Sequence, residues 1–232
     1  MLEHRYTSGE YLQLNPNWHV EESAWKAKQI LQMLKRNHIE LETVCEVGCG
    51  AGEVLRQLQM RMAERCTFWG YDISPQALDL AKGRANDRLQ FHLADIRQVD
   101  NRLFDLILVL DVFEHLEDYF GFLRGIQPKG LYKMFHIPLD LSVQTVLRRR
   151  GLLKVREAYG HLHYFTKEIA LQALEDAGYE VLDYFYTARA IEQPTHEVGR
   201  MLLKLPRKLL FAFHKDFAAH LLGGWSLLVL AR

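Results

Sequence analysis

Short apolar runs alternate with amphipathic stretches along most of the chain. Strands are expected at 43–47, 67–72, 89–93, 104–110 and 130–136. Between them, the spacing of apolar positions predicts helices at 52–64, 75–84 and 116–126. Ser74 and Pro75 support the second helix, because serine is a good N-cap and proline suits the first helical position. Strands joined by crossover helices are typical of a parallel α/β sheet.

Further elements flank this core. A helix is expected at 22–35, where apolar side chains recur at helical spacing, and it would pack on the sheet or over a ligand crevice as a lid. Thr166 can cap a helix that runs to Ala177, and strands are expected at 180–186 and 226–230. The fold class is therefore α/β, with a doubly wound, seven-stranded, mostly parallel sheet and one antiparallel strand near an edge.

A long helical insertion, 188–224, precedes the last strand, and insertions of this length are commonly functional. Four apolar residues are expected to share one face of an amphipathic helix there: Leu210, Phe213, Phe217 and Leu221. Packing on the sheet or in a homodimer ranks first as its role, a cap over the substrate second and contact with a membrane surface third. The tract 201–222 carries too many charges for a helix that spans a bilayer, so no stable membrane insertion is expected.

Composition narrows the class of protein. The 232 residues, 49% of them hydrophobic and 25% charged, suit one soluble globular domain, with 1–40 as an N-terminal helical cap and 41–140 as the core. Lysine and arginine number 29, as do aspartate and glutamate, so no global positive field attracts nucleic acid. The three cysteines lack metal-ligand spacing, and the first thirty residues lack an apolar signal-peptide run. A cytoplasmic location fits best.

A glycine-rich loop follows the first strand of the core. Its sequence is Glu46-Val-Gly48-Cys49-Gly50-Ala-Gly52, and it leads into a helix. Glycines at this spacing let the chain turn tightly and let a ligand lie against bare backbone. A βα turn without a ligand and a nicotinamide-dinucleotide site are alternatives, but position 53 is glutamate instead of the sixth-position glycine. The loop also offers no cation for a pyrophosphate, which favours a cationic sulfonium ligand.

Two carboxylates follow at the ends of the next strands. Asp72 lies 20 positions after Gly52, where it could accept both hydroxyls of a ribose. Asp95 ends the third strand and could accept the amino hydrogens of adenine, which a dehydrogenase does not need. Glu46 adds a negative group that could hold the loop or the amino end of a methionine moiety.

These residues resemble the class I S-adenosylmethionine-dependent methyltransferases of the small-molecule type, with a Rossmann-like fold. The matching stretches are 44–52, 71–75, 93–96, 104–116, 161–166 and 177–179. The resemblance implies S-adenosyl-L-methionine as cofactor and S-adenosyl-L-homocysteine as product. It further implies that 46–52 wraps the methionine part, Asp72 binds the ribose, Asp95 and Ile96 frame the adenine, and Leu110 and Asp111 line the methyl-bearing face. Ile73 is a further expected cofactor-binding residue.

Methyl transfer is an in-line displacement, so the protein mainly aligns the reactants, and a base matters if the acceptor is a hydroxyl. Histidines are the candidates because their pKa lies near neutrality. His161 is the first choice, since it occupies the histidine position of the family's His-Leu-x-x-Phe-Thr segment, and His115 is the second. His136 and His163 also lie at or after strand ends, and a structural role is open for all four. No His/Cys/Asp group has zinc-site spacing, so no catalytic metal is expected.

The sequence thus predicts a methyltransferase for a small-molecule acceptor, with O-methylation slightly preferred over N- or C-methylation. An NAD-dependent oxidoreductase and a non-catalytic adenosylmethionine-binding protein are the competing classes. Nucleic acid as acceptor is disfavoured, because Leu110-Asp-Val-Phe113 stands where base-amino methyltransferases carry Asn/Asp-Pro-Pro-Tyr/Phe. The identity of the acceptor is not encoded in the cofactor motifs.

Overall fold

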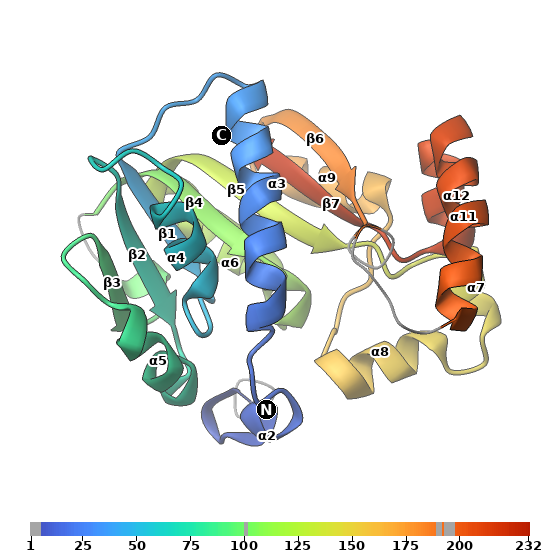
Figure 1. The fold of residues 1–232 in the computed structure, drawn as a ribbon, viewed down its shortest axis with the longest axis horizontal. Helices are drawn as coiled ribbons and strands as arrows, with labels where there is room; N and C mark the ends of the chain where they lie inside the picture. Colours follow the sequence, from blue (N-terminus) through green and yellow to red (C-terminus); the bar gives the residue numbers. More distant parts are fainter. Residues whose placement is uncertain (1–5, 100–101, 189–191, 193–197) are drawn as a thin grey trace.

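A seven-stranded sheet forms the centre of the molecule (Figure 1). The computed structural model describes residues 6–99, 102–188, 192 and 198–232. The strands follow the order β3-β2-β1-β4-β5-β7-β6. Their bounds are Thr43–Val47 (β1), Thr67–Asp72 (β2), Leu89–Leu93 (β3), Phe104–Leu110 (β4), Gly130–Pro138 (β5), Val181–Thr187 (β6) and Ser226–Ala231 (β7). The first five strands are parallel and β7 is antiparallel to both β5 and β6, so the predicted fold class is confirmed.

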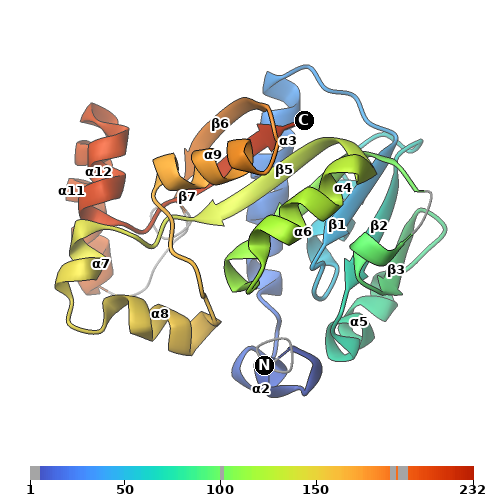
Figure 2. The same ribbon diagram turned by 180° about the vertical axis from the view of Figure 1, so that it is seen from behind.

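Helices cover both faces of the sheet. One face carries α3 (Ser23–Arg36), α4 (Glu53–Gln59) and α5 (Pro75–Ala81), and the other carries α6 (Tyr119–Ile126) and α9 (Lys167–Asp176) (Figures 1 and 2). The short α2 (Glu10–Leu14) lies near the N-terminus, below the ends of the strands in Figure 1. Coverage of both faces explains why the central strands read as continuous apolar runs instead of an alternating pattern.

Strand β4 shows how this core is built. Successive side chains of a strand point to opposite faces, so Ile107 and Val109 pack towards α6 and α9, whereas Leu106 and Leu108 pack towards α3 and α4. All four side chains are fully buried. Burying an aliphatic side chain of this size contributes about 1.5–3 kcal/mol. The polar C-terminal ends of these strands are thereby held on a rigid support.

The expected strands and the order of the core helices agree with the structure, but several boundaries differ. Helix α4 ends at Gln59 instead of 64, because residues 60–65 are largely exposed and Met62 alone among them packs against the core. Helix α6 begins at Tyr119 instead of 116, because the Asp118 carboxylate accepts from the backbone N–H of Gly121 and so caps the helix. The short 3-10 turn Phe113–His115 occupies the chain just before it.

Four helices form a separate group at the β6 and β7 side of the molecule, seen on the right of Figure 1. They are α7 (Val143–Leu147), α8 (Gly151–Tyr159), α11 (Val198–Phe213) and α12 (Lys215–Leu222). The first two were not expected from the sequence. Neither contains a buried residue, so the apolar pattern that marks a core helix is absent from them.

The expectation of one amphipathic helix with a single apolar face in the insertion is wrong. The chain breaks at His214, whose ring accepts from the backbone N–H of Phe217 and caps α12. Leu210 packs against the small cluster of Ala188, Ala218, Ala219 and Trp225. Phe213 and Phe217, in contrast, are 87% and 52% exposed. Residues 189–191 and 193–197 of the insertion, and 1–5 of the N-terminal cap, lie outside the described residues.

Candidate active site

A cavity of about 330 Å³ lies at the C-terminal edge of the sheet. Its floor comes from the glycine loop after β1 and from the ends of β4 and β5. Its walls come from the N-terminal segment 11–26, from Tyr159 at the end of α8 and from His161. Parallel sheets bind ligands at this edge, because the loops that follow the strands converge there. The cavity therefore brings together segments from almost the whole chain.

The glycine loop has the backbone conformation that its sequence predicts. Gly50 has φ +53° and Gly52 has φ +74°, both in the left-handed region that L side chains rarely adopt. A Cβ on Gly50 would lie 2.4 Å from the Trp18 ring, and one on Gly52 would lie 2.3 Å from the Phe91 ring. Only glycine fits these two positions, and the loop is consequently compact and exposes its backbone to the cavity.

Asp72, at the end of β2, fastens the loop. Its carboxylate is buried and accepts from the backbone N–H of Gly50 at 2.8 Å and from that of Ser74 at 2.8 Å. Burial raises the pKa of Asp72, while the three backbone N–H donors at Ser74, Gly50 and Ile73 oppose that rise. In this structure Asp72 thus supports the loop from outside the cavity lining. Its role towards a ribose stays a prediction.

The residues expected around the adenine also lie beside the cavity, not in its lining. Asp95 is held by Arg97, whose guanidinium lies 2.6 Å from Asp95 Oδ2. Ile96 is 1% exposed and belongs to the core, whereas Ile73 is 39% exposed at the end of β2. Their surfaces adjoin the same sheet edge, and their contacts with an adenine remain predictions.

Glu46 lines the cavity from β1 and is 3% exposed. Its Oε2 has no hydrogen-bond partner among the described residues. Burial raises its pKa to about 8; Lys26 opposes this rise, and Asp72 adds to it. An unpaired buried acid is costly, because the group has lost its hydration without replacing it. The site is therefore suited to a cationic group placed next to Glu46.

Asp111, directly after β4, is the centre of a charged network. It lies 2.6 Å from Lys26 Nζ and accepts from His136 Nδ1 at 2.6 Å. Its φ of +57° is unusual for a residue other than glycine, and strained backbone of this kind costs about 1–3 kcal/mol. Burial would raise the pKa of Asp111, but His136 and Lys26 outweigh it and hold that pKa well below its usual range. The pairs fix the carboxylate in the cavity wall.

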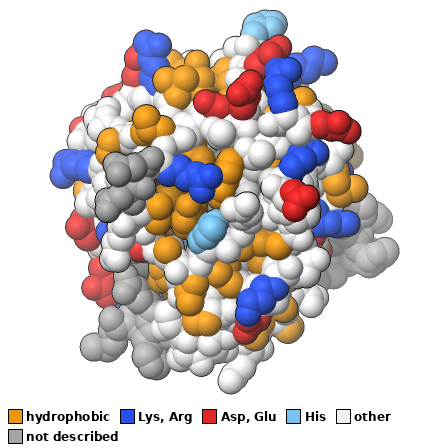
Figure 3. All heavy atoms as spheres, turned by 90° about the vertical axis from the view of Figure 1, so that its left-hand side faces the viewer, with side chains coloured by type: hydrophobic (Ala, Val, Ile, Leu, Met, Phe, Trp, Pro, Cys, Tyr) orange, Lys and Arg blue, Asp and Glu red, His pale blue; other side chains and the backbone are white. Residues whose placement is uncertain are grey.

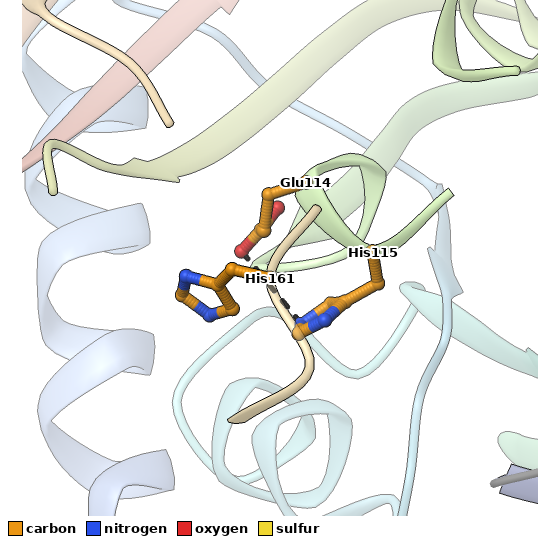
Figure 4. A group of neighbouring side chains, drawn as sticks. All are labelled: Glu114, His115 and His161. Carbon is orange, nitrogen blue, oxygen red and sulfur yellow. Dashed lines mark ion pairs between the residues drawn. The ribbon is translucent and has the colours of Figure 1, made fainter. Parts of the chain in front are cut away.

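His115 and His161, the two histidines chosen from the sequence, both line the cavity. Their rings meet edge to face at 4.8 Å (Figure 4). His161 Nδ1 lies 2.6 Å from Asp140 Oδ2, and Asp140 also lines the cavity. Because a carboxylate only accepts, His161 carries its proton on Nδ1, and its Nε2 is left with a lone pair. The structure thus assembles a histidine whose tautomer is set by a carboxylate.

Glu114 lies behind these histidines (Figure 4). It is fully buried, and neither carboxyl oxygen has a hydrogen-bond partner among the described residues. Burial, together with the charges of Asp111 and Asp140, raises its pKa well above the usual range. Its Oε1 lies 4.0 Å from His115 Nε2.

Among the described residues, two groups at the cavity could hold a metal ion, since the ligand atoms of each lie within 4.8 Å of one another: Glu114, His115 and His161, and His19, Glu21 and Glu22. The expectation that catalysis needs no metal remains a prediction. The other two histidines named from the sequence have different surroundings. His136 belongs to the Asp111 network, and His163 Nε2 lies 2.9 Å from the Leu116 carbonyl oxygen, as expected for a structural histidine.

The N-terminal segment covers the cavity. Tyr11 and Trp18 both line it, and their rings meet edge to face at 5.0 Å. Tyr6 OH lies 3.0 Å from His115 Nδ1, which ties this segment to the histidine pair. The aromatic residues ahead of the core thus serve the site. Trp25 also lines the cavity; its ring lies 5.9 Å from that of His136, and it donates to Glu192.

Sequence reasoning missed three residues of the site: Lys26, Asp140 and Glu114 as a buried acid. Lys26 is 85 positions from Asp111, and Asp140 is 21 positions from His161, so no local spacing marks either pair. A signal existed only for Glu114, which stands next to His115 in a segment that the sequence already singled out.

Comparison with known proteins agrees with this geometry. The family described as "Methyltransferase domain" matches residues 18–184, well over half of the chain. The chain is 30% identical over 106 residues to nodulation protein S of Sinorhizobium fredii (strain NBRC 101917 / NGR234), covering 44% of this chain and 48% of that protein. It is 27% identical over 160 residues to the ubiquinone biosynthesis O-methyltransferase of Methylobacterium sp. (strain 4-46), covering 61% of each.

The matched region thus spans about half to three fifths of the curated relatives' length. Among solved structures, the plantazolicin methyltransferase BpumL in complex with SAH superposes with a TM-score of 0.64 at 14% identity, over 99% of this chain and 93% of that chain. That likeness establishes the fold. Together with the family match over residues 18–184, it places this chain in the methyltransferase domain family.

Proposed function

We propose that the chain is an S-adenosylmethionine-dependent methyltransferase that acts on a small molecule, with a hydroxyl as the preferred acceptor. The observation that carries the proposal is Glu46, a buried acid with an unpartnered oxygen beside an exposed glycine backbone. A sulfonium and an α-ammonium are cationic, so such a ligand supplies what Glu46 lacks. The curated relatives include an O-methyltransferase, which supports the same class.

The residues present fit this cofactor. The loop 48–50 offers bare backbone, Glu46 offers a carboxyl group that a neighbouring cation would favour in its ionised form, and Leu110 with Asp111 lines the same cavity. S-adenosylmethionine would supply an electrophilic methyl group to the acceptor. A dinucleotide fits less well, because its pyrophosphate needs a cation, and Lys26, the lysine of this cavity lining, lies 2.6 Å from Asp111. An NAD-dependent oxidoreductase is therefore the weaker alternative.

His161 is the residue that favours a hydroxyl acceptor. Asp140 holds its proton on Nδ1, so Nε2 can take a proton from an acceptor hydroxyl in the cavity. The Asp140 carboxylate also stabilises the imidazolium that results, as in other carboxylate–histidine pairs. An amine acceptor that is already neutral would need no such base. A protein that only binds the cofactor would have no use for the pair.

Cofactor affinity should depend on pH through Glu46. Its pKa of about 8 means that it carries a proton at pH 7, and a cationic ligand beside it favours the ionised form. Binding should therefore release a proton below pH 8, so affinity rises by up to about tenfold per pH unit and levels off above 8. Calorimetric titration with S-adenosylmethionine in two buffers of different ionisation enthalpy measures this release.

Glu46→Gln is the matched control, because it keeps the shape of the side chain and cannot titrate. Its titrations should give the same heat in both buffers. If the Glu46→Gln variant still releases a proton on binding, another group titrates, and Glu46 is not the residue that responds to the cofactor.

The acceptor can be sought by thermal shift. Candidate phenols, alcohols and amines are added to protein saturated with S-adenosylhomocysteine, and ligands that raise Tm are then tested for methyl transfer by mass spectrometry. We expect hits among hydroxyl compounds, with the added methyl on oxygen. Methylation of amines alone, with hydroxyl compounds inert, would contradict the preference for O-methylation.

A further inference from the structure

An unusual number of large apolar side chains is exposed on the helices at the β6 and β7 side of the molecule. On α11, Leu205, Leu209 and Phe213 recur every four residues and are 64%, 53% and 87% exposed. Residues spaced in this way lie on one face of a helix. Further exposed apolar side chains on the neighbouring helices are Val143, Val146, Leu147, Leu153 and Phe217. Soluble surfaces seldom gather this many, and such patches mark interaction sites.

The same helices concentrate positive charge. The stretches 143–159 and 204–222 contain nine lysines and arginines but only two acidic residues, whereas the whole chain has 29 of each sign. Arg148, Arg149 and Arg150 are consecutive and exposed between α7 and α8. Both acidic residues are paired: Glu157 with Arg150, and Asp216 with Lys167 at 2.8 Å. The local charge is therefore strongly positive in a chain whose net charge is zero.

The apolar and basic side chains belong to one structural group. Helices α7 and α12 are in contact, and Arg207 of α11 donates to the Gln144 side chain of α7 and to the Leu222 carbonyl of α12. Figure 1 shows α7, α8, α11 and α12 together, on the side of the molecule away from β3. At the β3 side, Figure 3 shows basic and acidic side chains interspersed. We call the exposed side chains of α7, α8, α11 and α12 the basic apolar surface.

We propose that the basic apolar surface docks onto an anionic lipid bilayer. Apolar side chains bury in the boundary between headgroups and acyl chains, while lysines and arginines pair with anionic headgroups. A protein partner with an acidic groove would require an apolar face whose shape matches that groove. A bilayer requires only exposed apolar residues flanked by cations, which is what these helices present. Within the described residues, none of the helices has the length and apolar character of a membrane span, so the contact is peripheral.

The position of this surface relates it to the cavity. Tyr159, the last residue of α8, lines the cavity, and so does Asp140, just before α7. The helices of the basic apolar surface therefore connect directly to the cavity wall. Docking would place the cavity next to the bilayer, where an acceptor of low water solubility is concentrated.

Vesicle sedimentation tests the proposal without any measurement of activity. The full chain is mixed with vesicles of phosphatidylcholine, or with vesicles of equimolar phosphatidylcholine and phosphatidylglycerol. We expect partitioning into the anionic vesicles to be stronger by about tenfold or more, and to weaken as salt is raised, because screening reduces the attraction. The variant with Arg148→Gln, Arg149→Gln and Arg150→Gln should lose most of this preference.

Phe213→Ser should also weaken binding to anionic vesicles, and its 87% exposure predicts little change in Tm. Leu103→Ser is the matched control and should leave vesicle binding unchanged, because Leu103 is 75% exposed but lies just before the central strand β4, outside the basic apolar surface. Equal partitioning into both vesicle types would overturn the proposal. So would a dimer in sedimentation equilibrium that Phe213→Ser dissociates, since the surface would then be an interface between two copies of the chain.

Discussion

Replacing His161 by alanine should lower kcat by roughly 10²–10⁴-fold while the affinity for S-adenosylhomocysteine stays nearly constant. The reason is that a general base acts in the transition state, and His161 pairs with Asp140, whereas the glycine loop is anchored by Asp72. The measurements are turnover on an identified hydroxyl acceptor, calorimetric affinity and Tm, all on one preparation.

His163→Ala is the control for this experiment. His163 stands two residues away and contacts the Leu116 carbonyl, but it does not line the cavity. It should retain turnover and lose only stability. If His161→Ala keeps kcat within about threefold, too small a change for the loss of a general base, His161 is not the base. In that case His115→Ala is tested in the same way. Full activity in both variants would mean that the protein promotes methyl transfer by aligning the reactants, without a base.

Gly50→Val should nearly abolish cofactor binding, with affinity lower by roughly 100-fold. Two costs add: the left-handed φ of +53° strains any branched residue, and its Cβ would lie 2.4 Å from the Trp18 ring. Displacing the loop would also break the hydrogen bond from Gly50 N–H to Asp72. Calorimetry with S-adenosylhomocysteine measures the loss, and Tm shows how much of it comes from the fold.

Gly83→Ala is the matched control for glycine replacement. Gly83 lies in the 3-10 turn after α5, and a Cβ there would meet nothing within 4 Å. Its affinity and Tm should stay close to those of the unmodified chain. If Gly50→Val instead binds within threefold of the unmodified chain and is equally stable, the loop is not where the ligand lies.

Most of the sheet could be predicted, because a buried strand is marked by an apolar run within a few consecutive residues. Strand β4 is covered on both faces, so its apolar run is continuous and its bounds can be read directly from the sequence. The helices α7 and α8 were not predicted, because they bury none of their residues and an apolar pattern is the main sequence signal for a helix. The break between α11 and α12 at His214 was not predicted, because histidine is an uncommon N-cap.

The site likewise contains features that the local sequence predicts and features that depend on the fold. The glycines of the loop could be predicted, because their conformation is a property of a few consecutive residues. The pairing of Asp111 with Lys26 and of His161 with Asp140 could not, since each joins segments that only the fold brings together. The buried state of Glu114 likewise depends on packing around the 3-10 turn Phe113–His115, where its oxygens lose contact with solvent.

Cofactor choice distinguishes a methyltransferase from a dinucleotide-dependent enzyme. One preparation of the chain is titrated calorimetrically with S-adenosylhomocysteine and, separately, with NAD under the same conditions. We expect saturable binding of S-adenosylhomocysteine and no appreciable heat with NAD, because Glu46 favours a cationic ligand and Lys26 is paired with Asp111. Tighter binding of NAD than of S-adenosylhomocysteine would contradict it.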